Sequence, residues 1–286
     1  MPDHPSDVPA SSTKRPRVSA VSYLNTVPLI WGLEHSPDLK DAVELRYALP
    51  SVCAEQMAAG QADIGILPVI EMARQGLDYF PGTGIACHGP VRTILLVSKV
   101  PIRQIQTVAT DAGSRSSVML TRIILGERYG VTPRLFSHPA DLEWMLKHAD
   151  AALIIGDPAL QFDPAELPYE CLDLGGEWVE MTGLPMVFAV WSAGGKWVEP
   201  GRKDELTRIF VDSCRYGLDH IDDIVAQESQ ARHVSADLAR EYLTRHIVFE
   251  LGDKDYDGMR EYLKLARALD KKDQDSALVS ISQPQS

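Results

Sequence analysis

Hydroxyl and amide side chains at the ends of predicted elements carry most of the chemistry that this sequence offers. The first group, Ser22, Asn25 and Thr26, follows the apolar run Val18–Val21 and precedes Pro28. This pattern is typical of a buried strand that leads into a helix, because proline is tolerated in a first helical turn. Asn25 or Thr26 would cap that helix, whose free N–H groups would form an anion site beyond the strand. Capping alone would also account for both residues.

A second group of hydroxyls, Ser114, Ser116 and Ser117, opens a predicted helix that runs to Tyr129. Their hydroxyls and the exposed N–H groups of the helix could hold a carboxylate without any lysine. Arg115 could pair with a carboxylate through two hydrogen bonds, or it could point to solvent. Ordinary capping is the alternative interpretation of the three serines.

Other familiar sites are absent from the sequence. It contains no G-x-S-x-G, H-E-x-x-H, G-x-x-x-x-G-K-[ST] or G-x-G-x-x-G motif, and its eight histidines are scattered, so no metal is predicted. Thr182 and Gly183 could add a hydroxyl and an N–H group to a site, and a tight turn is the alternative there. His88 could reach a cleft, although a hydrogen-bonded structural role is the usual one for such a residue. Asp157 follows a predicted strand and could cap a helix.

Composition limits the classes of partner. The 286 residues are 45% hydrophobic, enough for one large core or two smaller ones. The net charge of −12 argues against nucleic acid or an anionic membrane as a partner, so an anionic ligand would need local donors. The four cysteines form no C-x-x-C pair and are predicted to be buried, unpaired thiols.

The two ends of the chain differ from the rest. Residues 1–16 and 271–286 are polar and are predicted to be disordered tails. No apolar segment approaches the ~20 residues of a spanning helix, and the amino terminus lacks the apolar core of a signal peptide. A cytoplasmic protein with no membrane contact is therefore expected, while the oligomeric state stays unknown.

Short apolar runs that alternate with helical patterns predict an α/β fold. The predicted strands are Val18–Val21, Val43–Leu49, Ile64–Leu67, Ile94–Ser98, Thr107–Thr110, Leu135–Ser137, Ala151–Ile155 and Val187–Ser192. The predicted helices are Val52–Ala59, Val69–Gln75, Ser117–Tyr129 and Leu142–Lys147, then four near the carboxyl terminus at about 204–220, 221–232, 236–246 and 256–269. Ser235 is expected to cap the third of these four, and Asp253 or Asp255 the fourth. The glycines Gly82, Gly84 and Gly89 are expected in turns.

Five segments, in order, resemble the chorismate dehydratases, the first enzymes of the futalosine route to menaquinone. These segments are Ser22–Leu29, Gly60–Val69, Thr110–Ser117, Asp150–Asp157 and Asp173–Trp191. The resemblance implies a two-lobed type II periplasmic-binding-protein-like fold with a ligand cleft between the lobes. The pattern of predicted elements is interrupted near residues 99–101 and 193–195. These interruptions then suggest one lobe of 17–98 plus 193–270, and an inserted second lobe of 99–192.

The resemblance also implies a function. The expected activity is that of a hydro-lyase (a carbon–oxygen lyase), which removes water from chorismate to give 3-[(1-carboxyvinyl)oxy]benzoate without a cofactor. Ser22, Asn25 and Thr93 would orient one substrate carboxylate, which acts as the base, while Ser114, Ser116 and Ser117 would hold the other. Thr26, Arg115, Thr182 and Gly183 complete the expected binding residues.

Two positions depart from the family pattern. Thr93 stands where the family usually has serine, and Ser116 stands where it usually has threonine; both changes keep the hydroxyl. Two other functions remain open. One is a non-catalytic carboxylate-binding protein or sensor of the same fold, and the other is the sister enzyme that closes the naphthoate ring. Conversion of chorismate to the aromatic product would separate the first of these from the dehydratase, while a different amino-terminal motif sets the sister enzyme apart.

Overall fold

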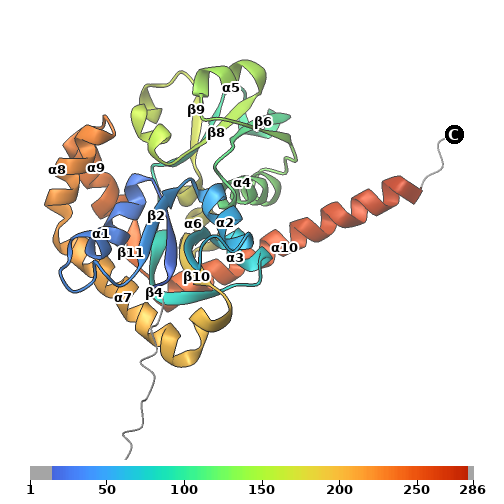
Figure 1. The fold of residues 1–286 in the computed structure, drawn as a ribbon. Coiled ribbons are helices and arrows are strands. Elements are labelled where there is room, and N and C mark those ends of the chain that lie inside the picture. Colours follow the sequence, from blue (N-terminus) through green and yellow to red (C-terminus); the bar gives the residue numbers. More distant parts are fainter. Residues whose placement is uncertain (1–14, 283–286) are drawn as a thin grey trace, which may run out of the picture.

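Two β-sheets, each in its own lobe, organise the computed structural model, which describes residues 15–282 (Figure 1). Lobe 1 contains the six-stranded sheet of order β11-β4-β10-β3-β1-β2, and lobe 2 the five-stranded sheet of order β7-β6-β8-β5-β9. The strands are β1 (Arg17–Val21), β2 (Glu44–Ala48), β3 (Ile64–Pro68), β4 (Asp78–Cys87), β5 (Ile94–Ser98), β6 (Thr107–Asp111), β7 (Arg134–His138), β8 (Ala151–Ile155), β9 (Glu170–Asp173), β10 (Met186–Ala193) and β11 (Val248–Glu250). All eight predicted strands are present, and the α/β prediction is confirmed.

Most of the helices lie where the sequence predicts them, but the helix at Leu174–Thr182 is not among those predicted. They are α1 (Val27–His35), α2 (Pro50–Ala58), α3 (Val69–Arg74), α4 (Ser116–Glu127), α5 (Leu142–His148), α6 (Leu174–Thr182), α7 (Pro200–Asp219), α8 (Ile221–Ala231), α9 (Ala236–Glu241) and α10 (Asp253–Ser282). Pro28 lies in the first turn of α1, as predicted, and a 3-10 turn (Leu24–Thr26) separates that helix from β1. Ser235 caps α9 by accepting a hydrogen bond from the Leu238 N–H group at 3.1 Å. No helix among the described residues is long and apolar enough to cross a membrane.

Both crossings between the lobes lie one strand earlier than expected. Strand β5, expected at the end of lobe 1, pairs with β8 and β9 in the sheet of lobe 2. Strand β10, expected in lobe 2, pairs with β3 and β4 in the sheet of lobe 1. Both are fully buried apolar runs, and such runs do not indicate which of two sheets they join.

Strand β4 is absent from the sequence-based prediction, because Pro81, Gly82 and Gly84 are typical of turns. In the structure Gly82 and Gly84 are strand residues, so their prediction as turn glycines is wrong. Gly82 has φ +95°, and a Cβ atom on Gly84 would lie 2.7 Å from the Ala189 carbonyl oxygen. Glycine is therefore required by the bend of the strand and by the close approach of its neighbour.

The carboxyl-terminal end of the chain also differs from expectation. Helix α10 continues to Ser282, where the sequence predicts a disordered tail from residue 271. Residues 1–14 and 283–286, which belong to the two predicted tails, lie outside the described residues. Between α9 and β11 the chain forms a π-helical segment, Tyr242–His246, inside what the sequence predicts as one helix.

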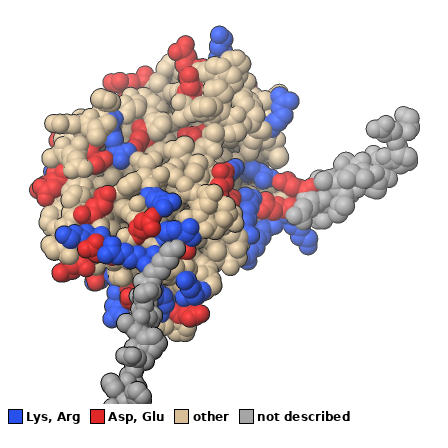
Figure 2. Space-filling model, viewed as in Figure 1, with Lys and Arg blue, Asp and Glu red and all other residues tan. Residues whose placement is uncertain are grey.

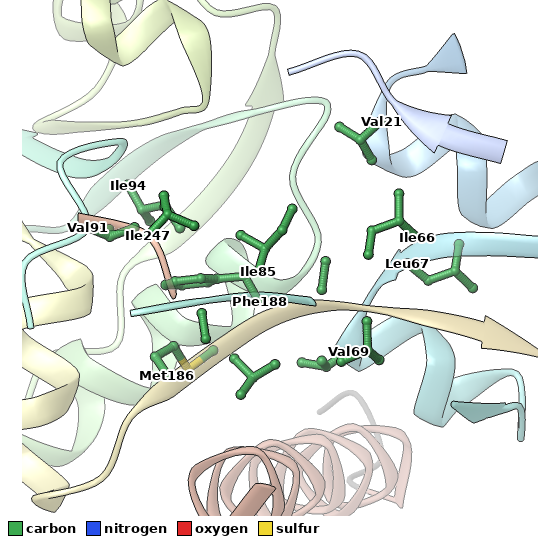
Figure 3. Packing of buried hydrophobic residues seen from close by; sticks show 14 of the residues in the cluster. Val21, Ile66, Leu67, Val69, Ile85, Val91, Ile94, Met186, Phe188 and Ile247 are labelled. Carbon is green, nitrogen blue, oxygen red and sulfur yellow. The ribbon is translucent and has the colours of Figure 1, made fainter. Parts of the chain in front are cut away.

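The main apolar core runs through both lobes. Figure 3 shows Ile66, Leu67 and Val69 packed beneath Val21 on one side, while Ile85 and Phe188 continue the cluster towards the other. A smaller core lies within lobe 2. Three of the four free cysteines are buried as predicted, and Cys171 is half-buried.

Candidate functional site

A pocket lies where the two lobes meet. It encloses about 580 Å³ free of protein atoms, part of it open to solvent. Its lining comprises Val21, Tyr23, Asn25, Pro50, Pro68, Ile85, Val91, Thr93, Ile94, Ser114, Arg115, Ser116, Ser117, Ile155, Gly156, Phe188 and Ala189. Most of the wall is apolar, and Figure 3 labels four of its apolar residues, Ile85, Val91, Ile94 and Phe188, within the hydrophobic cluster. The polar groups are few and come from both lobes.

Asn25 and Thr93 both line this pocket, and both contact a third residue outside its lining that the sequence does not indicate. Asn25 Nδ2 donates to the Tyr242 hydroxyl at 3.0 Å, and Thr93 Oγ1 lies 2.8 Å from the same hydroxyl. Tyr242 is completely buried, and burial raises the pKa of its phenol, so the phenol stays neutral. In a helical pattern with an apolar residue at every third or fourth position, a tyrosine is expected to pack in the hydrophobic core. Nothing in the sequence therefore indicates that Tyr242 contacts Asn25 and Thr93.

A carboxylate holds the loop that presents Thr93. Asp173 accepts hydrogen bonds from the Val91 and Arg92 N–H groups at 2.9 and 2.6 Å, and it also caps α6. Arg92 adopts φ +69°, a left-handed conformation that costs free energy in a residue other than glycine. Its guanidinium donates to the carbonyl oxygens of Ala159 and Phe162, at 2.7 and 2.6 Å. Hydrogen bonds from its backbone N–H groups and from the Arg92 side chain thus hold the loop in place.

The three serines of the second group lie at the start of α4, as predicted. Ser114 is 5% exposed, and its Oγ has no hydrogen-bond partner among the described residues. Ser116 Oγ donates to the Phe188 carbonyl oxygen at 3.2 Å, whereas its own carbonyl accepts from the Tyr262 hydroxyl at 2.9 Å. Buried polar groups are nearly always paired, so an unpaired hydroxyl that lines a pocket is a candidate contact for a ligand or a water molecule. The free N–H groups in the first turn of α4 add partial positive charge at the same place.

Arg115 lies at the rim of the pocket. Its guanidinium is 3.6 Å from the Glu55 carboxylate of α2 in lobe 1, and the two side chains are 45% and 68% exposed. The arginine therefore joins the two lobes at the surface instead of presenting a free cation to the interior.

Tyr23 closes the pocket between the lobes. A Cβ atom on Gly156 would lie 2.7 Å from the Tyr23 ring, so this glycine lets the ring of lobe 1 pack directly on the backbone of lobe 2. Burial raises the pKa of the Tyr23 phenol, and the nearby carboxylates of Asp111 and Asp157 raise it further. Among the described lining residues, Tyr23 and Arg115 are the only ionisable side chains. The lining contains no aspartate, glutamate, histidine or lysine.

Asp157 links the lobes outside the pocket. Its carboxylate accepts from the Leu24 N–H group at 2.9 Å and forms an ion pair with Arg232, which also pairs with Glu228 at 2.9 Å. Its side chain thus crosses to lobe 1 instead of capping a helix. Burial raises the pKa of Asp157, although Arg232 opposes that shift.

Four expected site residues lie outside the pocket lining. The Ser22 side chain is exposed, and Thr26 is fully buried beside Asn25. Thr182 Oγ1 donates to the Trp178 carbonyl oxygen at 2.8 Å, and Gly183 ends α6 with φ +70°. A helix end and turn, the alternative interpretation, accounts for this last pair.

Two other candidates from the sequence can be placed. The His88 ring nitrogen Nε2 lies 2.8 Å from the buried Asp255 carboxylate, in agreement with a structural role. Within residues 15–282 no group of three or more histidine, cysteine, aspartate or glutamate side chains is placed to hold a metal ion.

Comparison with known proteins adds family information to this geometry. Residues 16–268 match a protein family described as menaquinone biosynthesis. A chorismate dehydratase of Thermus thermophilus is 25% identical over 238 residues, which cover 77% of this chain and 84% of that protein. A chorismate dehydratase of Campylobacter jejuni is 24% identical over 258 residues, with coverage of 87% and 96%.

Solved structures agree on the fold. A protein of Archaeoglobus fulgidus has a TM-score of 0.74 at 13% identity and covers 90% of this chain and 98% of its own. The periplasmic aliphatic sulphonate binding protein of Escherichia coli has a TM-score of 0.60 at 15% identity, with coverage of 89% and 87%. The predicted periplasmic-binding-protein-like fold is thereby confirmed.

Proposed function

Because this chain belongs to the menaquinone biosynthesis family, we propose that it is a chorismate dehydratase. In this proposal it acts as a hydro-lyase that converts chorismate to 3-[(1-carboxyvinyl)oxy]benzoate and water. The substrate is a small dianion with an apolar ring, and the pocket combines apolar walls with hydroxyl, amide and N–H donors from two lobes. The two relatives described as chorismate dehydratases support this assignment at the level of the family.

One observation carries the proposal for the site. The unpaired, buried Ser114 hydroxyl at the start of α4 and the Asn25–Thr93 pair line the same pocket. Two sets of donors in one apolar pocket match two carboxylates on one substrate. Helix-terminal N–H groups stabilise the negative charge of one carboxylate, and the enclosed setting strengthens each hydrogen bond.

The chemistry of the lining suggests where the base comes from. The reaction removes a proton from the ring carbon that bears the ether, forms the ring π bond with that electron pair, and expels the neighbouring hydroxyl, which takes up a proton and leaves as water. The described lining offers no carboxylate or imidazole, and burial keeps the Tyr23 phenol protonated. We therefore assign the base to one of the two carboxylates of the substrate, oriented by Asn25 and Thr93.

Aromatisation makes the elimination strongly favourable, so the protein has to position groups and stabilise charge more than supply a strong acid or base. Tyr23, packed across the junction of the lobes, would exclude water from the reacting atoms. Ser22, Thr26, Thr182 and Gly183 remain predictions of the sequence and have no assigned contact in this proposal.

The test is direct conversion of chorismate. We expect the purified protein to give an aromatic product whose mass is one water lower than that of chorismate, with no added metal or cofactor. Binding of chorismate without turnover would instead favour the non-catalytic carboxylate-binding protein. A protein that neither binds nor converts chorismate would refute the proposal altogether.

A further inference from the structure

Tyr242 is the buried residue on which the two lobe-junction donors converge. Its hydroxyl lies 3.0 Å from Asn25 Nδ2 and 2.8 Å from Thr93 Oγ1, although these residues are 217 and 149 positions away in the chain. It opens the π-helical segment Tyr242–His246, and such segments are frequent at functional sites. Tyr242 itself does not line the pocket, so any role it has is exerted through its two partners.

The number of protons available on each group determines which atoms donate the hydrogen bonds in this cluster. A phenol has one proton to donate, and it accepts one hydrogen bond here from Asn25 Nδ2. The amide is oriented with its Oδ1 towards the Thr26 hydroxyl, 3.5 Å away, which leaves Nδ2 for the phenol. Tyr242 is fully buried, so its own proton needs an acceptor, and Thr93 Oγ1 is the other atom within reach.

The consequence concerns the hydroxyl of Thr93. If Thr93 Oγ1 accepts from Tyr242, the Thr93 proton is free to point into the pocket. Thr93 then acts as a hydrogen-bond donor, and the second Nδ2 hydrogen of Asn25 is available in the same way. Both groups suit a ligand oxygen that carries negative charge.

We infer that Tyr242 is a positioning residue, which orients the Thr93 hydroxyl so that it acts beside Asn25 as a donor to one carboxylate of the substrate. The inference rests on the proposed function, because it assigns these donors to chorismate. It predicts a dependence that packing alone would not create: the hydroxyl of Tyr242 matters only while residue 93 has a hydroxyl to orient.

The experiment is a double-mutant cycle with Tyr242→Phe and Thr93→Val, with chorismate turnover as the readout. We expect kcat/KM to fall about tenfold for Tyr242→Phe, the equivalent of one ordinary hydrogen bond. In the Thr93→Val background the same change should have almost no further effect. Thr93→Ser, which keeps the hydroxyl, should preserve the full sensitivity to Tyr242→Phe.

Tyr256→Phe is the matched control. The Tyr256 hydroxyl also holds one hydrogen bond, from the Gly82 N–H group at 2.7 Å, but it lies outside the pocket. We expect that variant to lose thermal stability with unchanged kcat/KM. Tyr242→Phe with wild-type kinetics, or losses that multiply independently in the double variant, would overturn the inference.

Two further outcomes keep the test decisive. Should Tyr242→Phe not fold, 3-fluorotyrosine at position 242 keeps the shape and strengthens the donor. Turnover should then change when Thr93 is present and stay constant in the Thr93→Val background; no change in either background refutes the inference. A wild-type protein that leaves chorismate unchanged refutes the proposed function, whereas wild-type turnover with an insensitive Tyr242→Phe variant refutes only the role of Tyr242.

Discussion

Replacement of Ser114 by alanine should move stability and substrate affinity in opposite directions. The Ser114 hydroxyl is buried and has no partner among the described residues, so its removal breaks no hydrogen bond within the described protein. Removing it should leave the free energy of unfolding unchanged or raise it by up to about 1–3 kcal/mol. With substrate bound, the same hydroxyl would donate to a carboxylate. A hydrogen bond to a charged group contributes about 1.5–3 kcal/mol, so KM should rise about 10- to 150-fold.

Ser213→Ala provides the matched control for this prediction. Ser213 is another buried serine, and its Oγ donates to the Leu29 carbonyl oxygen at 2.8 Å and accepts from the Leu33 N–H group at 3.0 Å. It lies on α7 and is not part of the pocket lining. Its replacement should lower the free energy of unfolding by about 1–3 kcal/mol and leave KM unchanged.

The assay measures thermal unfolding of the free protein and steady-state turnover of chorismate for both variants. Opposite patterns for Ser114→Ala and Ser213→Ala are expected. If Ser114→Ala instead loses stability and keeps its KM, the hydroxyl is a structural group and the assignment of the helix start to a carboxylate is wrong.

Four other changes test separate parts of the site. Asn25→Asp should lose most activity with little loss of stability, because it brings negative charge towards a dianion; near wild-type turnover would contradict its site role. Thr93→Val should lose activity while Thr93→Ser keeps it, and an active valine variant would return Thr93 to packing. Arg115→Ala should change KM less than about threefold at any ionic strength, because Glu55 already neutralises the guanidinium at the rim; a steep salt dependence would instead make it the anion site. Asp111→Asn should raise the thermal stability at neutral pH, because burial raises the pKa of this carboxyl group above its ordinary 3.8. The folded state then binds the proton more tightly, so the charged form costs stability at high pH, and the advantage of asparagine should vanish as the pH falls through that raised pKa. An advantage that persists in acid would point to packing instead of charge.

Local signals in the sequence predict the parts of the site that lie next to one another along the chain. The segment from β1 to α1 is predictable because a buried apolar run and Pro28 together specify a strand and a helix, although neither Asn25 nor Thr26 caps α1 through its side chain. The same holds for Ser114, Ser116 and Ser117, whose hydroxyls stand at the start of an apolar, helical pattern. In both cases the chemistry and the backbone are encoded by the same few positions.

The remaining parts depend on contacts between distant segments. Tyr242 reaches Asn25 and Thr93 only through the packing of the carboxyl-terminal helices, and its own neighbourhood has the pattern of a uniform helix. Strand β4 is not predicted because its proline and glycines are typical of turns. Two of these glycines are required, Gly82 by the bend of the strand and Gly84 by the close approach of its sheet neighbour. Strands β5 and β10 belong to a lobe because of the strands with which they pair. No local sequence pattern indicates which strands those are.

In the proposed function, the net charge of −12 and a dianionic substrate are compatible because recognition is assigned to local donors in the pocket. Figure 2 shows acidic and basic side chains interspersed over the face in view, so no continuous cationic surface attracts the substrate there. Exposed charges are screened over about 8–10 Å at physiological ionic strength, so the distant carboxylates contribute little inside the pocket. Helix-terminal N–H groups and hydroxyls act at hydrogen-bond distance, and the apolar walls around them lower the local dielectric constant. The carboxylate assigned as the base is held by the neutral donors Asn25 and Thr93, which lower its pKa less than a full positive charge would and leave it able to remove a proton. A lysine or arginine at the same position would bind the substrate more tightly and, by lowering the pKa of that carboxyl group, would weaken it as a base.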